Sequence, residues 1–115
     1  MNHFLSDDAR HVHDNIPDGI ENALTLSALS RVTGIEERSL KKRVQELRKA
    51  GYPIVSSSQG GYYIPREGNL NDIQGAERFC RMQSSQAVER FQSAKPVKKW
   101  LRNLDQMAIG DDHVS

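Results

Sequence analysis

Side chains able to bind nucleic acid recur at helical spacing in the middle of the chain. They are Arg38, Lys42, Gln45 and Lys49, with Lys41 and Arg48 beside them. A helix turns by about 100° per residue, so these residues share one side of a helix. Arginine can hydrogen-bond guanine and glutamine can hydrogen-bond adenine in the major groove, whereas basic side chains also contact phosphates. The spacing predicts a helix face that binds DNA.

An apolar stripe predicts how that helix is held in place. Leu40, Val44 and Leu47 recur on the side opposite the basic row, and this pattern predicts a helix from 36 to 50. Gly51 and Pro53 follow and are expected to end the helix.

A shorter helix is expected just before it. Thr25 and Ser27 are both suitable N-cap residues, and Gly34 suits the positive φ at which many helices end. Three apolar residues should point inward from this helix, namely Leu26, Leu29 and Val32. The two helices around the glycine turn predict a helix-turn-helix.

Strand-forming residues come next in the chain. Residues 52–57 and 61–64 are rich in aromatic and β-branched residues and flank a polar connection at 58–60. This pattern predicts a two-stranded hairpin, the wing, with an exposed tip. Tyr62 and Tyr63 should point to opposite faces, one into the core and the other to solvent.

Three short motifs in this stretch carry a family resemblance. They are NALT at positions 22–25, VQELRKAGYPI at 44–54 and GYYIP at 61–65. The chain resembles winged helix-turn-helix proteins of the biotin-repressor N-terminal type, and still more the small winged-helix proteins common in bacterial phages and prophages. The resemblance covers a little over a third of the chain and implies a winged-helix fold, which serves several functions. It also implies a helical tail after the wing.

Two functions are compatible with these features. The first is sequence-specific binding of double-stranded DNA by a phage or prophage transcriptional regulator, with helix 36–50 in the major groove and tip 58–60 on the backbone or minor groove. Base-reading residues are expected to be Arg38, Lys42 and Gln45. Phosphate contacts are expected from Arg31, Lys41, Arg43, Lys49, Ser58 and Gln59.

The second possible function is that of a phage-encoded protein-binding winged helix that acts through its tail or wing. Such a protein would be either an inhibitor of a host or defence protein or a replication adaptor.

Two acidic residues depart from the pattern of the resembled family. Glu36 and Glu37 open the second helix, where many of those proteins have serine or threonine. Acidic side chains suit the positive end of the helix dipole, but they would repel phosphates nearby.

The formal net charge of +1 conceals an asymmetry along the chain. Residues 1–22 hold one basic and five acidic residues, which gives −4, whereas residues 23–66 hold eight basic and three acidic residues, which gives +5. Residues 67–115 hold seven of each. Positive charge concentrated on the helix-turn-helix favours a phosphate-binding face, and an ordinary solvated helix face is the alternative.

Catalytic and metal-binding patterns are missing from the sequence. It contains no nucleophile elbow, metalloprotease motif or phosphate loop, so we expect no enzymatic activity. Cys80 is the only cysteine, and His11 and His13 would point to different faces of a helix, so no metal and no other cofactor is expected. No apolar run approaches the roughly 18 residues of a membrane span. The first residues also lack the pattern of a signal peptide, so no membrane partner and a cytoplasmic location are expected.

A short helix is expected near the N-terminus. Ser6 can cap it, and the acidic residues Asp7 and Asp8 suit its first turn. Such a helix would bring Val12 and Ile16 toward the core.

The C-terminal third is expected to be helical, with apolar stripes along helices that begin near Asn69 or Asn71 and near Pro96. The stripes predict a homodimer interface formed by Ile73, Ala76, Cys80, Ala87, Phe91, Trp100, Leu101 and Leu104. The alternative is that these helices pack back on their own chain and complete its core. Both arrangements are compatible with the pattern.

The whole sequence therefore predicts a mainly α fold with a small β-hairpin. The expected parts are an acidic N-terminal segment with a short helix (1–19), a winged helix-turn-helix (20–66), a C-terminal helical region (67–109) and a disordered tail (110–115).

Overall fold

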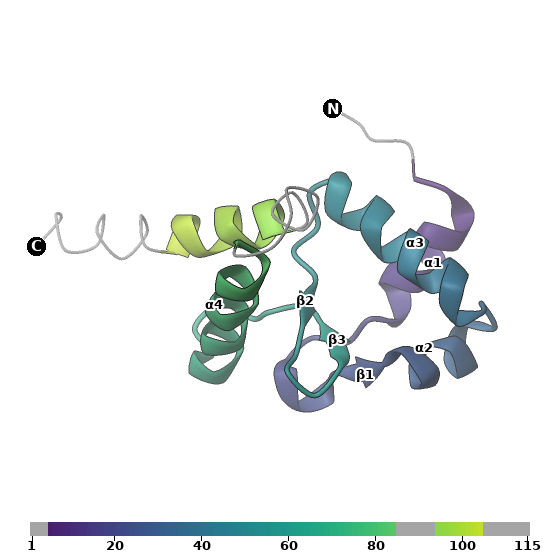
Figure 1. Cartoon of the computed structure of the whole chain (residues 1–115), viewed down its shortest axis with the longest axis horizontal. Helices are drawn as coiled ribbons and strands as arrows, with labels where there is room; N and C mark the ends of the chain where they lie inside the picture. Colours follow the sequence, from purple (N-terminus) through teal and green to yellow (C-terminus); the bar gives the residue numbers. More distant parts are fainter. Residues whose placement is uncertain (1–4, 85–93, 105–115) are drawn as a thin grey trace, which may run out of the picture.

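The computed structural model describes residues 5–84 and 94–104. The protein is mainly helical, with a small three-stranded antiparallel sheet (Figure 1). In chain order the elements are α1 (Asp7–Asn15), the 3-10 helix η1 (Ile20–Asn22), β1 (Leu24–Thr25), α2 (Leu26–Thr33), α3 (Glu37–Lys49), β2 (Val55–Ser56), β3 (Gly61–Tyr63) and α4 (Leu70–Ser84). Residues 94–104 are helical as well. The expected disorder of 110–115 falls outside the described residues.

Helix α1 begins where the sequence predicts. The Ser6 hydroxyl accepts a hydrogen bond from the backbone N–H of Ala9 at 3.1 Å, which satisfies a donor of the first turn. The same residue fixes the helix to α3, because its backbone N–H donates to the Glu46 carboxylate at 3.0 Å and its hydroxyl does so at 3.1 Å. Val12 and Ile16 are buried, as expected.

Helix α2 is capped by Thr25, whose hydroxyl accepts from the N–H of Ala28 at 3.1 Å, and it ends at Gly34 with φ 75°. Leu29 is fully buried. The prediction for Val32 is wrong, because its side chain is 56% exposed. The next residue, Thr33, is half-buried, and its hydroxyl donates to the Leu29 carbonyl at 2.7 Å.

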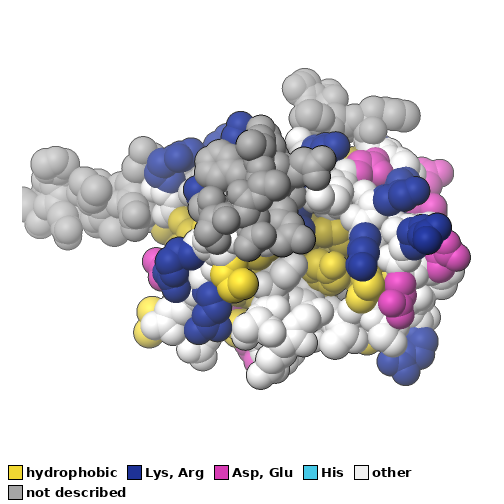
Figure 2. Space-filling view, in the orientation of Figure 1, with side chains coloured by type: hydrophobic (Ala, Val, Ile, Leu, Met, Phe, Trp, Pro, Cys, Tyr) yellow, Lys and Arg dark blue, Asp and Glu magenta, His cyan; other side chains and the backbone are white. Residues whose placement is uncertain are grey.

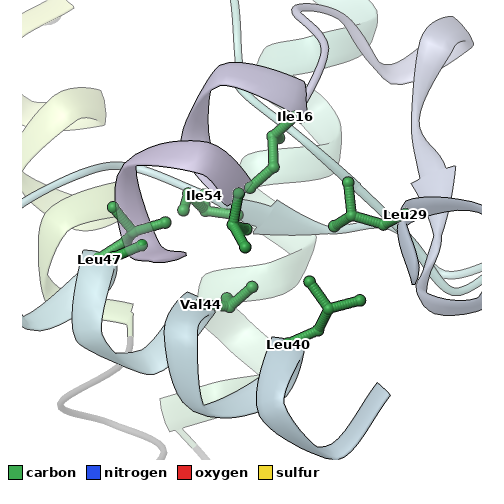
Figure 3. Close-up of a cluster of buried hydrophobic side chains, with 8 residues drawn as sticks. Ile16, Leu29, Leu40, Val44, Leu47 and Ile54 are labelled. Carbon is green, nitrogen blue, oxygen red and sulfur yellow. The ribbon is translucent and has the colours of Figure 1, made fainter. Parts of the chain in front are cut away.

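Helix α3 matches its predicted range to within one residue at each end. Its apolar stripe of Leu40, Val44 and Leu47 is buried. With Ala9, Val12, Ile16, Leu29 and Ile54 these residues form the first apolar cluster. Figure 3 shows how six of them converge between α1, α2 and α3.

The strands of the sheet are shorter than those of the predicted hairpin. The sheet also contains a third strand that the sequence pattern did not indicate. Its order is β1-β3-β2, with Leu24 opposite Tyr62 and Val55 opposite Tyr63. Strand β1 has only two residues, too few to show the alternation on which a strand prediction depends. Strands β2 and β3 have two and three residues, so the hairpin is mostly turn and extended chain.

A second apolar cluster lies on the other face of the sheet. It comprises Val55, Tyr63, Ala76, Phe79, Cys80, Ala94 and Val97. Neighbouring residues alternate between the clusters: Ile54 and Tyr62 contact the first, and Val55 and Tyr63 belong to the second. In Figure 1 helices α1–α3 lie on one side of the sheet, and α4 with residues 94–104 on the other. Tyr62 is therefore half-buried rather than exposed, because both faces of the hairpin are covered.

Part of the apolar stripe predicted to form a dimer interface is buried in this second cluster. Ala76 and Cys80 are buried in it, and Trp100 and Leu101 pack against it. Residues Ile73 and Leu104 are half-buried. The positions of Ala87 and Phe91 are outside the described residues. The C-terminal helices thus pack on their own chain, and this packing buries part of the surface that was predicted to form the dimer interface.

Candidate nucleic-acid interface

Helix α3 presents its predicted basic row to solvent. Arg38, Lys42, Gln45 and Lys49 are all exposed, and so is Lys41 beside them. The opposite side of the helix is fixed in the first cluster by its buried aliphatic residues. A rigid helix with one polar, cationic face results.

Within residues 5–84 and 94–104, no carboxylate forms an ion pair with Arg38, Lys41, Lys42 or Lys49. A phosphate could therefore approach them without displacing an existing ion pair. Arg31 of α2 is also exposed and makes no ion pair in that part of the chain.

Arg43, predicted to contact phosphate, points toward α1 instead. Its side chain is half-buried and pairs with Glu46 at 3.4 Å, and its Nη1 lies 3.5 Å from the Ser6 hydroxyl. The helical wheel contains a signal for this position, since Arg43 is only about 60° from Leu40 and borders the apolar stripe. Long basic side chains at such borders lay their stems along apolar surface. We therefore assign Arg43 to the contact between α1 and α3.

Arg48 also leaves the basic row that it was expected to flank. Its Nε and Nη2 donate to the Ile54 carbonyl at 3.0 and 2.8 Å, and Nη2 donates to the Ser56 hydroxyl at 3.1 Å. The guanidinium carbon is 4.9 Å from the centre of the Phe79 ring. Burial lowers the pKa of Arg48 to about 10, so the side chain stays charged at neutral pH. Arg48 thereby ties the last turn of α3 to strand β2.

The hairpin tip carries the remaining predicted contacts. Ser58, Gln59 and Gly60 are exposed. Ser57 holds the turn closed, because its N–H donates to the Gly61 carbonyl at 2.7 Å and its hydroxyl accepts from the Gly61 N–H at 3.1 Å. The side chains of Ser58 and Gln59 thus project from an ordered turn.

Acidic side chains share this side of the molecule. Glu36 and Glu37 are exposed at the start of α3, and Glu36 makes no side-chain capping hydrogen bond. Figure 2 shows Lys and Arg interspersed with Asp and Glu over the half of the molecule that contains α1–α3. The N-terminal end of α3 is therefore less favourable for phosphate than its middle and C-terminal turns.

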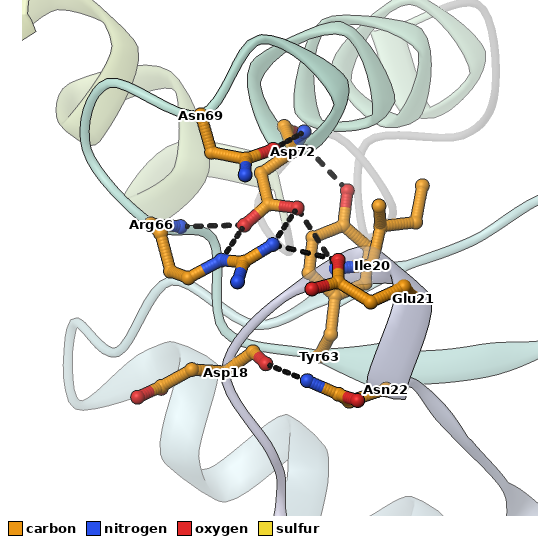
Figure 4. Close-up of polar contacts among 8 residues, drawn as sticks. All are labelled: Asp18, Ile20, Glu21, Asn22, Tyr63, Arg66, Asn69 and Asp72. Carbon is orange, nitrogen blue, oxygen red and sulfur yellow. Dashed lines mark hydrogen bonds and ion pairs between the residues drawn. The ribbon is translucent and has the colours of Figure 1, made fainter.

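An ion-pair network that the sequence did not indicate lies outside this face (Figure 4). Asp72 is fully buried and accepts from the backbone N–H of Ile20 at 2.8 Å and of Arg66 at 2.9 Å. The Arg66 guanidinium donates Nε to Asp72 at 2.8 Å and Nη2 to Glu21 at 2.6 Å. The network joins η1, the segment after β3 and helix α4. Arg66 is therefore engaged within the protein, although its charge counts toward the basic excess of residues 23–66.

Hydrogen bonding decides the charge state of Asp72. Burial by itself raises the pKa of this carboxyl, but hydrogen bonds from the Arg66 guanidinium and from the N–H groups of Ile20 and Arg66 outweigh it and lower the pKa. A local pattern could have indicated Asp72, since the Asn69 side chain accepts from the Asp72 N–H at 3.0 Å and caps α4. Its partner Ile20 is 52 residues away, so the pairing itself had no local signal.

Two histidines of α1 contact other parts of the protein. The Nε2 of His11 lies 3.0 Å from the Thr33 carbonyl oxygen, and the His13 ring packs 4.7 Å from the Tyr52 ring. Among the described residues, no three His, Cys, Asp or Glu side chains are grouped as metal ligands would be. That part of the chain also has no helix of the length and apolarity needed to cross a membrane.

Comparisons with protein-family models, with curated proteins and with solved structures gave no match. The candidate interface consists of an exposed cationic face on α3 and an exposed hairpin tip. Arg48 lies between them and ties the last turn of α3 to the hairpin.

Proposed function

We propose that α2, α3 and the β2–β3 hairpin form a winged helix-turn-helix that binds double-stranded DNA in a sequence-specific way, as a transcriptional regulator of the phage or prophage kind. The observation that carries the proposal is the exposed face of α3, whose four cations make no ion pair with any described carboxylate. A helix of this width fits the major groove. The apolar stripe on its far side leaves only this face to enter a groove.

The roles of the side chains follow from their chemistry. Arg38 and Lys42 can donate to guanine and Gln45 can bond adenine, so these residues are proposed to read bases. Lys41, Lys49 and Arg31 are proposed to bind phosphates, which fixes the position of the protein without reading sequence. The tip residues Ser58 and Gln59 would reach the backbone or the minor groove.

A salt titration tests the proposal. Binding to a duplex selected from a random pool is measured by fluorescence anisotropy at increasing salt. The logarithm of the association constant should fall linearly with the logarithm of the salt concentration, by about 0.9 for each phosphate contact. No duplex binding even at low salt would contradict the proposal and favour the protein-binding alternative.

Single substitutions separate base reading from phosphate contact. Arg38→Ala should reduce the discrimination between the selected duplex and a scrambled one by about 1–3 kcal/mol. Lys41→Ala should weaken binding to both duplexes alike and reduce the salt slope by about 0.9. Arg10→Ala, at an exposed position on α1, is the matched control and should change neither. Equal effects of Arg38→Ala on both duplexes would contradict a base-reading role.

Only part of the predicted homodimer surface is available, because Ala76 and Cys80 are buried in the monomer. Two modules on a twofold axis would read two half-sites. Among the predicted interface residues that the structure describes, Ile73, Trp100, Leu101 and Leu104 keep part of their surface exposed and could form such a contact. Light scattering at high micromolar concentration tests this prediction. A protein that remains monomeric under those conditions would contradict the homodimer.

A further inference from the structure

A second row of cations lies on the helix formed by residues 94–104. Lys95, Lys99 and Arg102 are exposed and recur at intervals of four and three residues, so they lie along one side of that helix. Its other side holds Ala94 and Val97, which are buried in the second cluster. The helix contains four basic residues and no acidic one, although the whole chain has a net charge of only +1.

Little negative charge opposes this row in the described part of the chain. There, no carboxylate forms an ion pair with Lys95, Lys99 or Arg102. The adjacent helix α4 adds two exposed arginines, Arg78 and Arg81. Of the two acidic residues on α4, Asp72 is buried in its own network and only Glu77 is exposed. Figure 2 shows Lys and Arg side chains over both α4 and the 94–104 helix on one face of the molecule.

We infer that Lys95, Lys99 and Arg102 bind the sugar-phosphate backbone of duplex DNA as a second contact surface that reads no sequence. This inference rests on the function proposed above. From Lys95 to Arg102 the helix rises by about 10 Å, which corresponds to about three successive phosphates of one strand. Point charges on flexible stems suit phosphates and carry no base specificity.

A membrane surface fits this row less well than DNA. A basic amphipathic helix binds lipid by burying its apolar face at the headgroup boundary. The apolar face of residues 94–104 is largely covered, because Ala94 and Val97 are fully buried and the half-buried Trp100 and Leu101 pack against the same cluster. The exposed cations of this helix are Lys95, Lys99 and Arg102, and a regular row of phosphates is the partner that matches them.

The test replaces all three cations in the full chain, as Lys95→Gln, Lys99→Gln and Arg102→Gln together. Affinity for the selected duplex is measured at about 50 and 200 mM salt, and three lost phosphate contacts should reduce the salt slope by about 2.7. The loss of affinity over that range should become ~40-fold smaller than in the wild type. Discrimination against a scrambled duplex should stay unchanged. Arg10→Gln is the control for a charge removed elsewhere, and circular dichroism checks that the variants fold.

The outcomes separate this inference from the proposed function. If the wild type binds the selected duplex and the triple variant keeps the wild-type slope, the inference is overturned while the proposed function stands. If the wild type binds no duplex at low salt, both are overturned. Altered discrimination in the triple variant overturns the claim that the row reads no sequence. Loss of binding to anionic phosphatidylserine vesicles, with an unchanged duplex slope, assigns the row to a lipid surface instead.

Discussion

The two apolar clusters on either side of the sheet are built in different ways. The first is made of aliphatic side chains that recur at helical spacing on α1, α2 and α3, such as Leu40, Val44 and Leu47. The second combines aromatic and small side chains with buried polar groups at its edge. There the Tyr63 hydroxyl donates to the Asp72 carbonyl at 3.2 Å, and the Asp72 carboxylate is fully buried.

This difference shows which parts of the fold local sequence can specify. A stripe on one helix needs only its own spacing, whereas the second cluster depends on pairs such as Ile20 and Asp72 that are far apart in the chain. The sheet joins the two clusters, because Tyr62 packs against the first and Tyr63 is buried in the second. We expect substitutions in the first cluster to act through lost packing and those around the second through lost hydrogen bonds and steric fit.

The largest effect is expected in the first cluster. Leu40→Ala should lower the free energy of unfolding by about 3 kcal/mol, because it removes a fully buried side chain and leaves a cavity. Urea denaturation measures this change. The matched control is Val32→Ala on α2, which should stay within about 0.5 kcal/mol because Val32 is exposed. Similar losses for the two variants would mean that Val32 is packed inward after all.

A smaller loss is expected where α3 meets the sheet. Arg48→Ala should cost about 2 kcal/mol, since it leaves the Ile54 carbonyl without its two guanidinium donors and removes the contact with the Phe79 ring. Its neighbour Lys49 is exposed, so Lys49→Ala should change stability by less than about 0.5 kcal/mol while weakening duplex binding. Equal stability losses for these adjacent residues would contradict the different roles that the structure gives them.

The helices and their ends could be predicted because their signals are local. Ser6 and Thr25 cap α1 and α2 as expected, Gly34 adopts positive φ after α2, and Leu40 and Leu47 define the buried side of α3. Each of these features depends on residues within about two helical turns. The exposed basic row of α3 was predictable for the same reason.

The parts that were missed depend on partners outside the element that holds them. Strand β1 exists because Leu24 pairs with Tyr62, and nothing in a two-residue strand indicates that pairing. Arg48 turns inward because Ile54 offers a carbonyl and Phe79 a ring face. A helical wheel shows that a side chain lies at the border of an apolar stripe, but it does not show which hydrogen-bond acceptor lies close to that side chain in the fold.

Gly75 of α4 provides a smaller and more specific test of the second cluster. A Cβ at this position would collide with the Tyr63 hydroxyl. Burial raises the pKa of Tyr63 to about 12, so that hydroxyl stays protonated. Replacing glycine by alanine within a helix normally stabilises a protein by up to about 1 kcal/mol. Here the collision should reverse the sign, and Gly75→Ala should cost about 1 kcal/mol by urea denaturation.

A double-mutant cycle identifies the cause of that cost. Tyr63→Phe removes the hydroxyl and should itself cost about 1 kcal/mol through the lost hydrogen bond to the Asp72 carbonyl. In the Tyr63→Phe background, Gly75→Ala should no longer destabilise, so the two changes should not be additive. Additive effects would place the strain of Gly75→Ala somewhere other than the Tyr63 hydroxyl.

The pH dependence of stability gives the last test, and it separates the buried carboxylate from the rest of the molecule. The pKa of Asp72 is lowered in the folded protein, because hydrogen bonds from Arg66 and two backbone N–H groups outweigh the effect of burial. In the unfolded chain an aspartate titrates near pH 3.9, so the contribution of Asp72 to stability is present above about pH 4 and is lost as the pH falls through the lower folded pKa.

Wild-type stability should therefore fall more steeply toward about pH 3 than that of Asp72→Asn, whose amide does not titrate. Glu67→Gln is the control, since Glu67 is exposed and forms no ion pair within residues 5–84 and 94–104, so it should change the acid limb far less. Urea midpoints from neutral to acidic pH give the comparison, and parallel curves for wild type and Asp72→Asn would mean that Asp72 is not a charged acceptor in the folded protein.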